Sequence, residues 1–169
     1  MKPRIFIASS VEGKDVADAL EIGLQYDGVC TAWHEVFALS QSTIDTLLRR
    51  CAENDFAIFV FSPDDRVTIR NQKYAITRDN VLFESGLFMG MHGRSRAFIV
   101  MPHENPYFHV PSDLLGFTPA TYDHERAKKE TTGALGAAVA KIRLDIKHSL
   151  WAQRRLEIKA YGSTLYIRA

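Results

Sequence analysis

Cysteine is scarce in this chain of 169 residues, which contains only Cys30 and Cys51. Two cysteines do not provide the dense disulfide framework of a small secreted domain, and neither has a second cysteine at zinc-ligand spacing. The six histidines form no metal-ligand pair on one helix face. We therefore expect reduced thiols in a cytoplasmic protein without a metal site.

Long apolar runs are also missing. None approaches the roughly 20 residues that span a bilayer, and a strand pattern from residue 4 leaves no room for a secretory leader. The formal net charge is only +1, so we expect no general attraction for nucleic acid or an anionic membrane. A Gly-rich phosphate loop and a nucleophile elbow are absent too, which disfavours the common nucleotide-loop and serine-hydrolase motifs.

Short apolar strands alternate with helical patterns along the chain. Strands are predicted at residues 4–8, 29–33, 56–61, 96–101 and, at an edge, 120–122. Helices are predicted between these strands and from about residue 131 to 160, whereas residues 62–78 and 102–119 are expected to be polar connections or loops. The inward stripe of the second helix is expected to be Ile44, Leu47, Leu48 and Cys51. This order predicts an α/β fold, doubly wound, with a mainly parallel sheet of four to five strands and helices on both faces.

Glu84 is the only ionisable residue between residues 81 and 91. A carboxylate is costly to bury among apolar side chains unless it is paired, hydrogen-bonded or protonated, so its isolation marks a candidate catalytic acid. The alternative is a glutamate that points to solvent or pairs with an arginine from elsewhere. Asp79 or Asn80 is predicted to cap this helix, which places Glu84 near its first turn. Gly86 and Gly90 give the helix a thin side that another backbone can approach closely.

Polar residues follow several of the predicted strands. Because ligands of doubly wound folds bind beyond the carboxyl ends of the strands, these residues are binding-site candidates. They are Ser9, Ser10, Trp33, His34, Asp64 and Asp65.

Three separated segments resemble a known family. They are residues 4–10 (RIFIASS), residues 31–40 with the following stretch to 65, and residues 78–90 (RDNVLFESGLFMG). Together they resemble the bacterial TIR-like domains, relatives of the Toll/interleukin-1 receptor fold that act as NAD-cleaving effectors in antiphage immunity. The resemblance covers about residues 1–150 and implies a flavodoxin-like sheet. It also implies that Glu84 is the catalytic residue.

The chemistry that the resemblance implies is cleavage of the nicotinamide–ribose bond of NAD+, which is a substrate, with no further cofactor. The leaving group is cationic and departs neutral, so no general acid has to protonate it. A carboxylate facing the sugar stabilises the oxocarbenium-like charge that develops there.

The predicted substrate contacts each have a structural alternative. Ser9 and Ser10 either meet ribose or phosphate or simply cap a helix. Trp33 either stacks on a base or packs in the core, and Phe37 lies in the loop that corresponds to the self-association loop of TIR domains. Asp64 either holds a ribose or serves a turn in the sequence Ser-Pro-Asp-Asp.

Two more predicted contacts, Arg78 and Asn80, flank the helix that carries Glu84. They either steer the pyrophosphate and fix Glu84, or serve in capping and surface pairing.

The resemblance also implies partners. It predicts self-association through TIR–TIR contacts and a cyclic-nucleotide-sensing domain or partner chain. We expect residues 1–160 to be a single TIR-like domain and residues 161–169 to be a tail or the start of a linker to such a sensor. Two alternatives stay open. One is a non-enzymatic TIR signalling or scaffold module, and the other is a nucleoside deoxyribosyltransferase-like enzyme, which also uses a glutamate to break an N-glycosidic bond.

Overall fold

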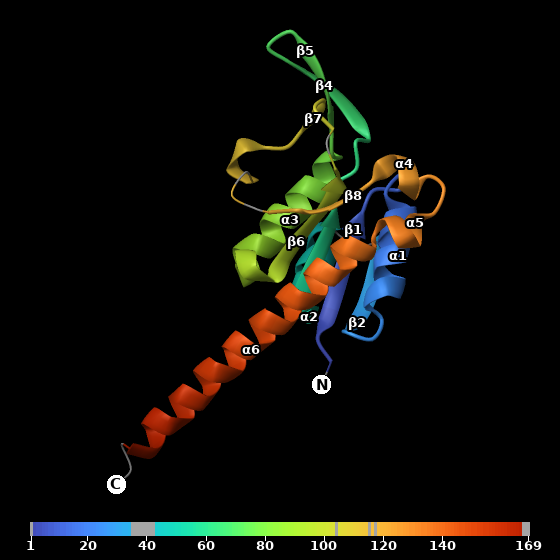
Figure 1. Ribbon diagram of the computed structural model, residues 1–169. Helices are drawn as coiled ribbons and strands as arrows, with labels where there is room; N and C mark the ends of the chain where they lie inside the picture. Colours follow the sequence, from blue (N-terminus) through green and yellow to red (C-terminus); the bar gives the residue numbers. More distant parts are fainter. Residues whose placement is uncertain (1, 35–42, 104, 115, 117, 167–169) are drawn as a thin grey trace.

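The main sheet of the protein has five strands in the order β2-β1-β3-β6-β8, and every neighbouring pair is parallel. The structure is a computed structural model that describes residues 2–34, 43–103, 105–114, 116 and 118–166 (Figure 1). The strands of this sheet are β1 (Arg4–Ser9), β2 (Val29–His34), β3 (Phe56–Val60), β6 (Ala97–Pro102) and β8 (Ala120–Tyr122). The predicted α/β, flavodoxin-like TIR fold with a parallel sheet is confirmed.

The central strands are buried on both faces, as their continuous apolar sequences predicted. In β3, every residue from Phe56 to Val60 is at most 1% exposed. Alternate residues point to two different core clusters, with Ile58 in the cluster on one face of the sheet and Phe59 in the other.

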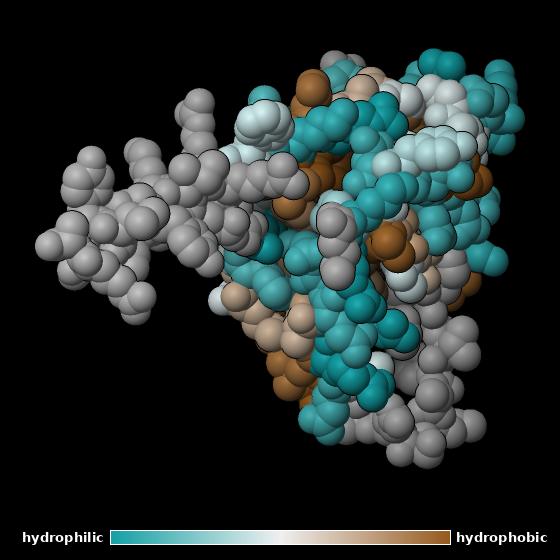
Figure 2. Space-filling view, turned by 90° about the horizontal axis from the view of Figure 1, so that it is seen from below, coloured by the Kyte–Doolittle hydropathy of each residue, from teal (hydrophilic) through white to brown (hydrophobic). Residues whose placement is uncertain are grey.

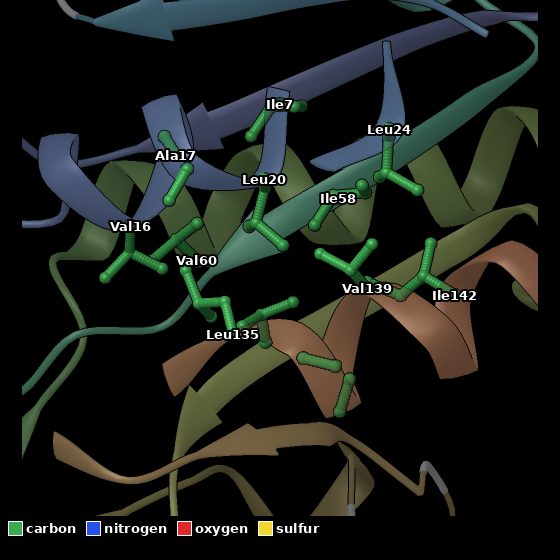
Figure 3. Packing of buried hydrophobic residues seen from close by; sticks show 14 of the residues in the cluster. Ile7, Val16, Ala17, Leu20, Leu24, Ile58, Val60, Leu135, Val139 and Ile142 are labelled. Atoms are coloured by element: carbon green, nitrogen blue, oxygen red, sulfur yellow. The ribbon is translucent and has the colours of Figure 1, made fainter. Parts of the chain in front are cut away.

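Helices cover both faces of the sheet (Figure 1). On one face lie α1 (Lys14–Leu24), α5 (Thr131–Ala134) and the first half of α6 (Gly136–Tyr166). The short helix α4 (His124–Ala127) precedes α5 in the chain. Figure 3 shows Leu20 and Leu24 of α1 pointing toward Val139 and Ile142 of α6, next to Ile58 of the sheet. The other face carries α2 (Thr43–Glu53) and α3 (Asp79–His92).

The inward stripe predicted for α2 is only half right. Leu47 and Cys51 are buried, whereas Ile44 is 42% and Leu48 39% exposed. Leu47 and Cys51 are four residues apart and therefore lie on one narrow strip of the helix. The helix covers the sheet with this strip alone.

Residues 62–78 contain a β-hairpin where a polar connection was predicted. Strand β4 (Asp65–Ile69) pairs antiparallel with β5 (Gln72–Ile76), and β5 pairs with β7 (Phe108–His109) inside the predicted loop 102–119. The turn residues Arg70 and Asn71 have φ of 49° and 66°, as a two-residue hairpin turn with positive φ at both positions requires. Figure 1 shows the hairpin extending beyond the carboxyl ends of the main strands.

The first half of α6 packs against α1 and is hydrogen-bonded to it and to the residues that follow it. Arg143 Nε donates to Asp27 Oδ2 at 2.7 Å, and its Nη2 donates to the carbonyl oxygen of Gly23 at 2.9 Å. A Cβ at Gly23 would lie 2.7 Å from Cγ2 of Val139, so the two helices approach closely at a residue without a side chain.

The second half of α6 extends away from the sheet (Figure 1). The helix continues to Tyr166, beyond the predicted end at residue 160, so the predicted domain boundary falls inside it. The division into a domain and a tail stays a prediction. None of the helices within the described ranges combines the length and hydrophobicity that a bilayer crossing requires. The face at the amino ends of the strands is largely hydrophilic, with hydrophobic side chains in separate patches (Figure 2).

Candidate active site

Glu84 lies on the buried side of α3. It is 8% exposed and shares its stripe with Val81, Ser85 and Phe88, spaced as one face of a helix requires. Phe88 packs edge-on against Phe59 of β3, with ring centroids 6.1 Å apart, which fixes this face toward the sheet. The expectation that Glu84 is a buried carboxylate in apolar surroundings is therefore confirmed.

The start of α3 differs from the predicted cap. The helix begins at Asp79, with Arg78 at the N-cap position and no side-chain capping bond from Arg78. Asp79 Oδ1 instead accepts a hydrogen bond from the backbone N–H of the next residue, Asn80, at 2.8 Å. Glu84 consequently lies in the second turn of α3 and not near the first turn, where it was predicted. With a rise of about 1.5 Å per residue, it is about 8 Å along the helix axis from Asp79.

The carboxylate of Glu84 is within electrostatic reach of Cys51 on α2. Burial raises the pKa of the Cys51 thiol above its ordinary value, and the negative charge of Glu84 raises it further. Cys51 also accepts a hydrogen bond at its backbone oxygen from the His92 ring, with the nitrogen 2.8 Å away. Glu84 thus exerts its charge in the interior between α2 and α3, where low polarity strengthens electrostatic interactions.

The serines after β1 are buried at the carboxyl edge of the sheet. Ser9 is 2% and Ser10 0% exposed. Ser10 Oγ accepts a hydrogen bond from the backbone N–H of Gly13, the N-cap residue of α1, at 3.1 Å. Ser10 therefore orders the turn that leads into α1, and its contact with a substrate stays a prediction.

Asp64 and Arg78 belong to a charged cluster at the same edge. The pKa of Asp64 is raised overall, chiefly by burial and further by the charge of Glu12. A hydrogen bond from Ser10 and the charge of Arg78 lower it in part. Arg78 pairs with Glu12 at 2.8 Å and with Asp65 at 3.8 Å. The surface-pairing alternative for Arg78 describes this arrangement, which ties α1, the hairpin and α3 together.

Two aromatic candidates are described only in part or not at all. The backbone of Trp33 pairs with Ala8 at the end of β1, but its side chain lies outside the described part of the structure. Phe37 lies outside the described residues altogether. Both residues were predicted to contact the substrate, and these contacts stay a prediction.

One pocket at the carboxyl edge was not anticipated. An open pocket of about 350 Å³ lies between the start of α1, the residues after β3, the end of β8 and the helices α4 and α5. Asp64 lines it together with Tyr122, the last residue of β8. Binding residues were predicted at the polar ends of the first three strands but not at the end of this edge strand. In the described ranges, no three His, Cys, Asp or Glu side chains cluster in a way that would hold a metal ion.

Comparison with known proteins identifies the family. Residues 4–124 match the family model described as CAP12/Pycsar effector protein, TIR domain. The chain is 36% identical over 154 residues to CD-NTase-associated protein 12 from Lachnospiraceae bacterium (strain RUG226), which covers 89% of this chain and 48% of that protein. It is 38% identical over 141 residues to the Pycsar effector protein PaPycTIR from Pseudomonas aeruginosa, covering 82% and 46% respectively.

The chain spans about half the length of these curated relatives. Its family model nevertheless covers the whole sheet, from β1 to the end of β8, together with Glu84 and its helix. The chain belongs to the CAP12/Pycsar effector TIR-domain family.

Proposed function

We propose that this chain is the effector domain of a bacterial antiphage defence protein and that it cleaves the nicotinamide–ribose bond of NAD+ with Glu84 as the catalytic carboxylate. The observation that carries the proposal is the burial of Glu84, 8% exposed on an otherwise apolar face of α3, where its charge acts on Cys51. A buried carboxylate with this environment is a functional-site candidate. Membership of an effector family supports the same conclusion.

In the proposed reaction the glycosidic bond breaks and its electron pair returns to the pyridinium nitrogen. Nicotinamide leaves as a neutral molecule, and positive charge develops on the ribose. Water then adds to the sugar and loses a proton, which gives ADP-ribose. Glu84 stabilises the positive charge. At about 4 Å and an effective dielectric constant of about 20, one carboxylate contributes about 4 kcal/mol, or about a thousandfold in rate.

The proposed contacts around Glu84 are Ser9, Trp33, Phe37 and Asn80, with Ser10 at the edge. Arg78 is paired with two acidic side chains and Asp64 lines a separate pocket, so we assign neither to the bound NAD+.

Activation is proposed to require assembly. The outer side of α3 is as apolar as its inner side, with Phe83 57% and Met91 45% exposed. A Cβ at Gly86 or Gly90 would meet no atom within 4 Å among the described residues, so the predicted thin side of the helix faces open space. Helices that are apolar all round are normally covered. We propose that copies of the chain associate when a sensor domain or partner chain detects a cyclic nucleotide. Relatives named as an effector and as an associated protein support a partner in the defence system.

The test is nicotinamide release by the concentrated protein. Glu84→Gln keeps the side-chain shape and removes the charge, so the rate should fall about a thousandfold while circular dichroism stays unchanged. Glu53→Gln is the matched control, because Glu53 is an exposed glutamate at the end of α2. The Glu53→Gln variant should be as active as the unmodified chain. Full activity in folded Glu84→Gln would remove the catalytic assignment.

Two further measurements separate the alternatives. Assembly without nucleotide consumption at high protein concentration would favour the scaffold module. Deoxynucleosides supplied beside NAD+ test for a deoxyribosyltransferase-like reaction. Specific activity that stays constant over a wide dilution range would contradict the requirement for assembly.

A further inference from the structure

The 350 Å³ pocket at the carboxyl edge lies on the α1 side of the sheet, whereas Glu84 belongs to α3, which packs on the other face. Figure 1 shows α4 and α5 beside the start of α1, near the end of β8. The pocket is as large as small ligand sites in proteins and occupies the edge at which doubly wound folds bind ligands. None of the residues that line it is among the proposed contacts of NAD+, although Ser10, at the edge of those contacts, donates a hydrogen bond to Asp64 in the pocket.

Tyr122 supplies a hydrogen-bond donor in this pocket. The residue is only 4% exposed and lines the pocket together with Asp64. Its ring lies near that of His124, with centroids 6.5 Å apart. A tyrosine hydroxyl beside a pocket can donate a hydrogen bond to a ligand.

Asp64 supplies an open acceptor. Its carboxylate takes a hydrogen bond from Ser10, while Oδ2 is buried without a hydrogen-bond partner among the described residues. Burial, and then the charge of Asp64, raise the pKa of Tyr122 to about 12, so the two side chains are within electrostatic reach. An unpaired acceptor, Asp64 Oδ2, and the hydroxyl-bearing Tyr122 therefore line one pocket.

The remaining walls restrict the kind of ligand. Val16, Pro63 and Ala127 form apolar walls suited to a flat ring. Glu12 and Asp15 add two carboxylates at the rim, which disfavour a phosphate or another anion.

The only lysine among the pocket residues is Lys128, and it is already paired with Glu125 at 2.6 Å.

We propose that this pocket binds a neutral heteroaromatic group that carries a hydrogen-bond donor next to an acceptor. The donor of the ligand bonds Asp64 and its acceptor receives the Tyr122 hydroxyl. The carboxamide of nicotinamide and the amino edge of adenine share this chemistry.

The experiment titrates the full chain with nicotinamide in one arm and adenosine in the other, up to millimolar concentration, by isothermal calorimetry and ligand-observed NMR. The Tyr122→Phe variant should bind the recognised probe about tenfold more weakly, since one hydrogen bond is lost. Its fold should be intact, because the substitution keeps the buried ring and removes only the hydroxyl. Tyr26→Phe is the matched control on an 80% exposed tyrosine and should bind like the unmodified chain.

Asp64→Asn is the second variant and should also weaken binding about tenfold, because the charge-assisted bond is lost. The probe whose binding is weakened by both variants, nicotinamide or adenosine, shows which of the two rings the pocket recognises. The proposal is overturned if neither probe binds, or if Tyr122→Phe and Tyr26→Phe bind equally. It is also overturned if Glu84→Gln abolishes binding, since the probe would then occupy the proposed catalytic site. An inactive but probe-binding Glu84→Ala chain would leave both proposals standing.

Discussion

The contact between α1 and α6 at Gly23 gives a sharp test of the packing. A Cβ on residue 23 would lie 2.7 Å from Cγ2 and 3.1 Å from Cγ1 of Val139, and contacts below 3.0 Å require something to move. Val139 is 7% exposed, and a β-branched side chain in a helix has one strongly preferred rotamer. The valine therefore cannot turn aside, and Gly23→Ala should force the two helices apart.

The expected energies follow from two opposing effects. Alanine is better than glycine inside a helix by about 1 kcal/mol, whereas overpacking a core costs about 1–3 kcal/mol. Gly23→Ala should therefore destabilise the chain by about 1 kcal/mol. In a Val139→Ala background the clash disappears, and the same substitution should stabilise the chain by about 1 kcal/mol. The coupling between the two sites is then about 2 kcal/mol.

The assay is urea unfolding of the unmodified chain, the two single variants and the double variant, with equal m-values as the condition for comparison. Each kcal/mol corresponds to a shift in Tm of about 2–4 °C for a chain of this size. Gly86→Ala is the control, because a Cβ there meets no described atom within 4 Å, and it should raise stability by about 1 kcal/mol. Additive effects of Gly23→Ala and Val139→Ala, within about 0.5 kcal/mol, would refute the close contact.

Three further predictions concern charge and pH. Glu84→Gln should lower the pKa of Cys51 but leave that of Cys30, at about 11, unchanged in a titration followed by cysteine 13Cβ shifts; an unmoved Cys51 would place the charge of Glu84 elsewhere. The folded pKa of Tyr122 is about 12 and the ordinary value is 10.0, so its contribution to stability falls as the pH rises from about 10 to about 12. Over that window the Tyr122→Phe variant should unfold less readily in urea than the unmodified chain. Equal alkaline sensitivity of the two chains would contradict this. Arg143→Ala removes a bond to a carboxylate and one to a carbonyl oxygen and should lower Tm by about 4–8 °C in a thermal melt, whereas an unchanged Tm would show that this link contributes nothing.

The sequence predicted the parts of the fold whose pattern is local. Strands β1 and β3 are continuous apolar runs, and such runs have few alternatives to the centre of a parallel sheet. Glu84 was found for a similar reason, since a single carboxylate in an apolar helix stands out without knowledge of its neighbours.

The errors have physical causes as well. The β4–β5 hairpin was missed because its turn uses Arg70 and Asn71 at positive φ, where glycine is the usual signal. The pocket was missed because Asp64 and Tyr122 meet only through the order of the strands. On α2 the apolar positions could not show that Ile44 would be exposed, because an apolar residue does not reveal which face its helix turns inward.

The long helix α6 has two halves with different surroundings. Among its described side chains the last buried one is Ile146, while Trp151 is already 68% exposed and the remaining turns project from the body (Figure 1). A projecting helical segment of about 15 residues is only marginally stable in water. Backbone amides of the projecting turns should therefore exchange with deuterium within the dead time of an ordinary experiment, while those near Ile142 stay protected until the whole domain opens.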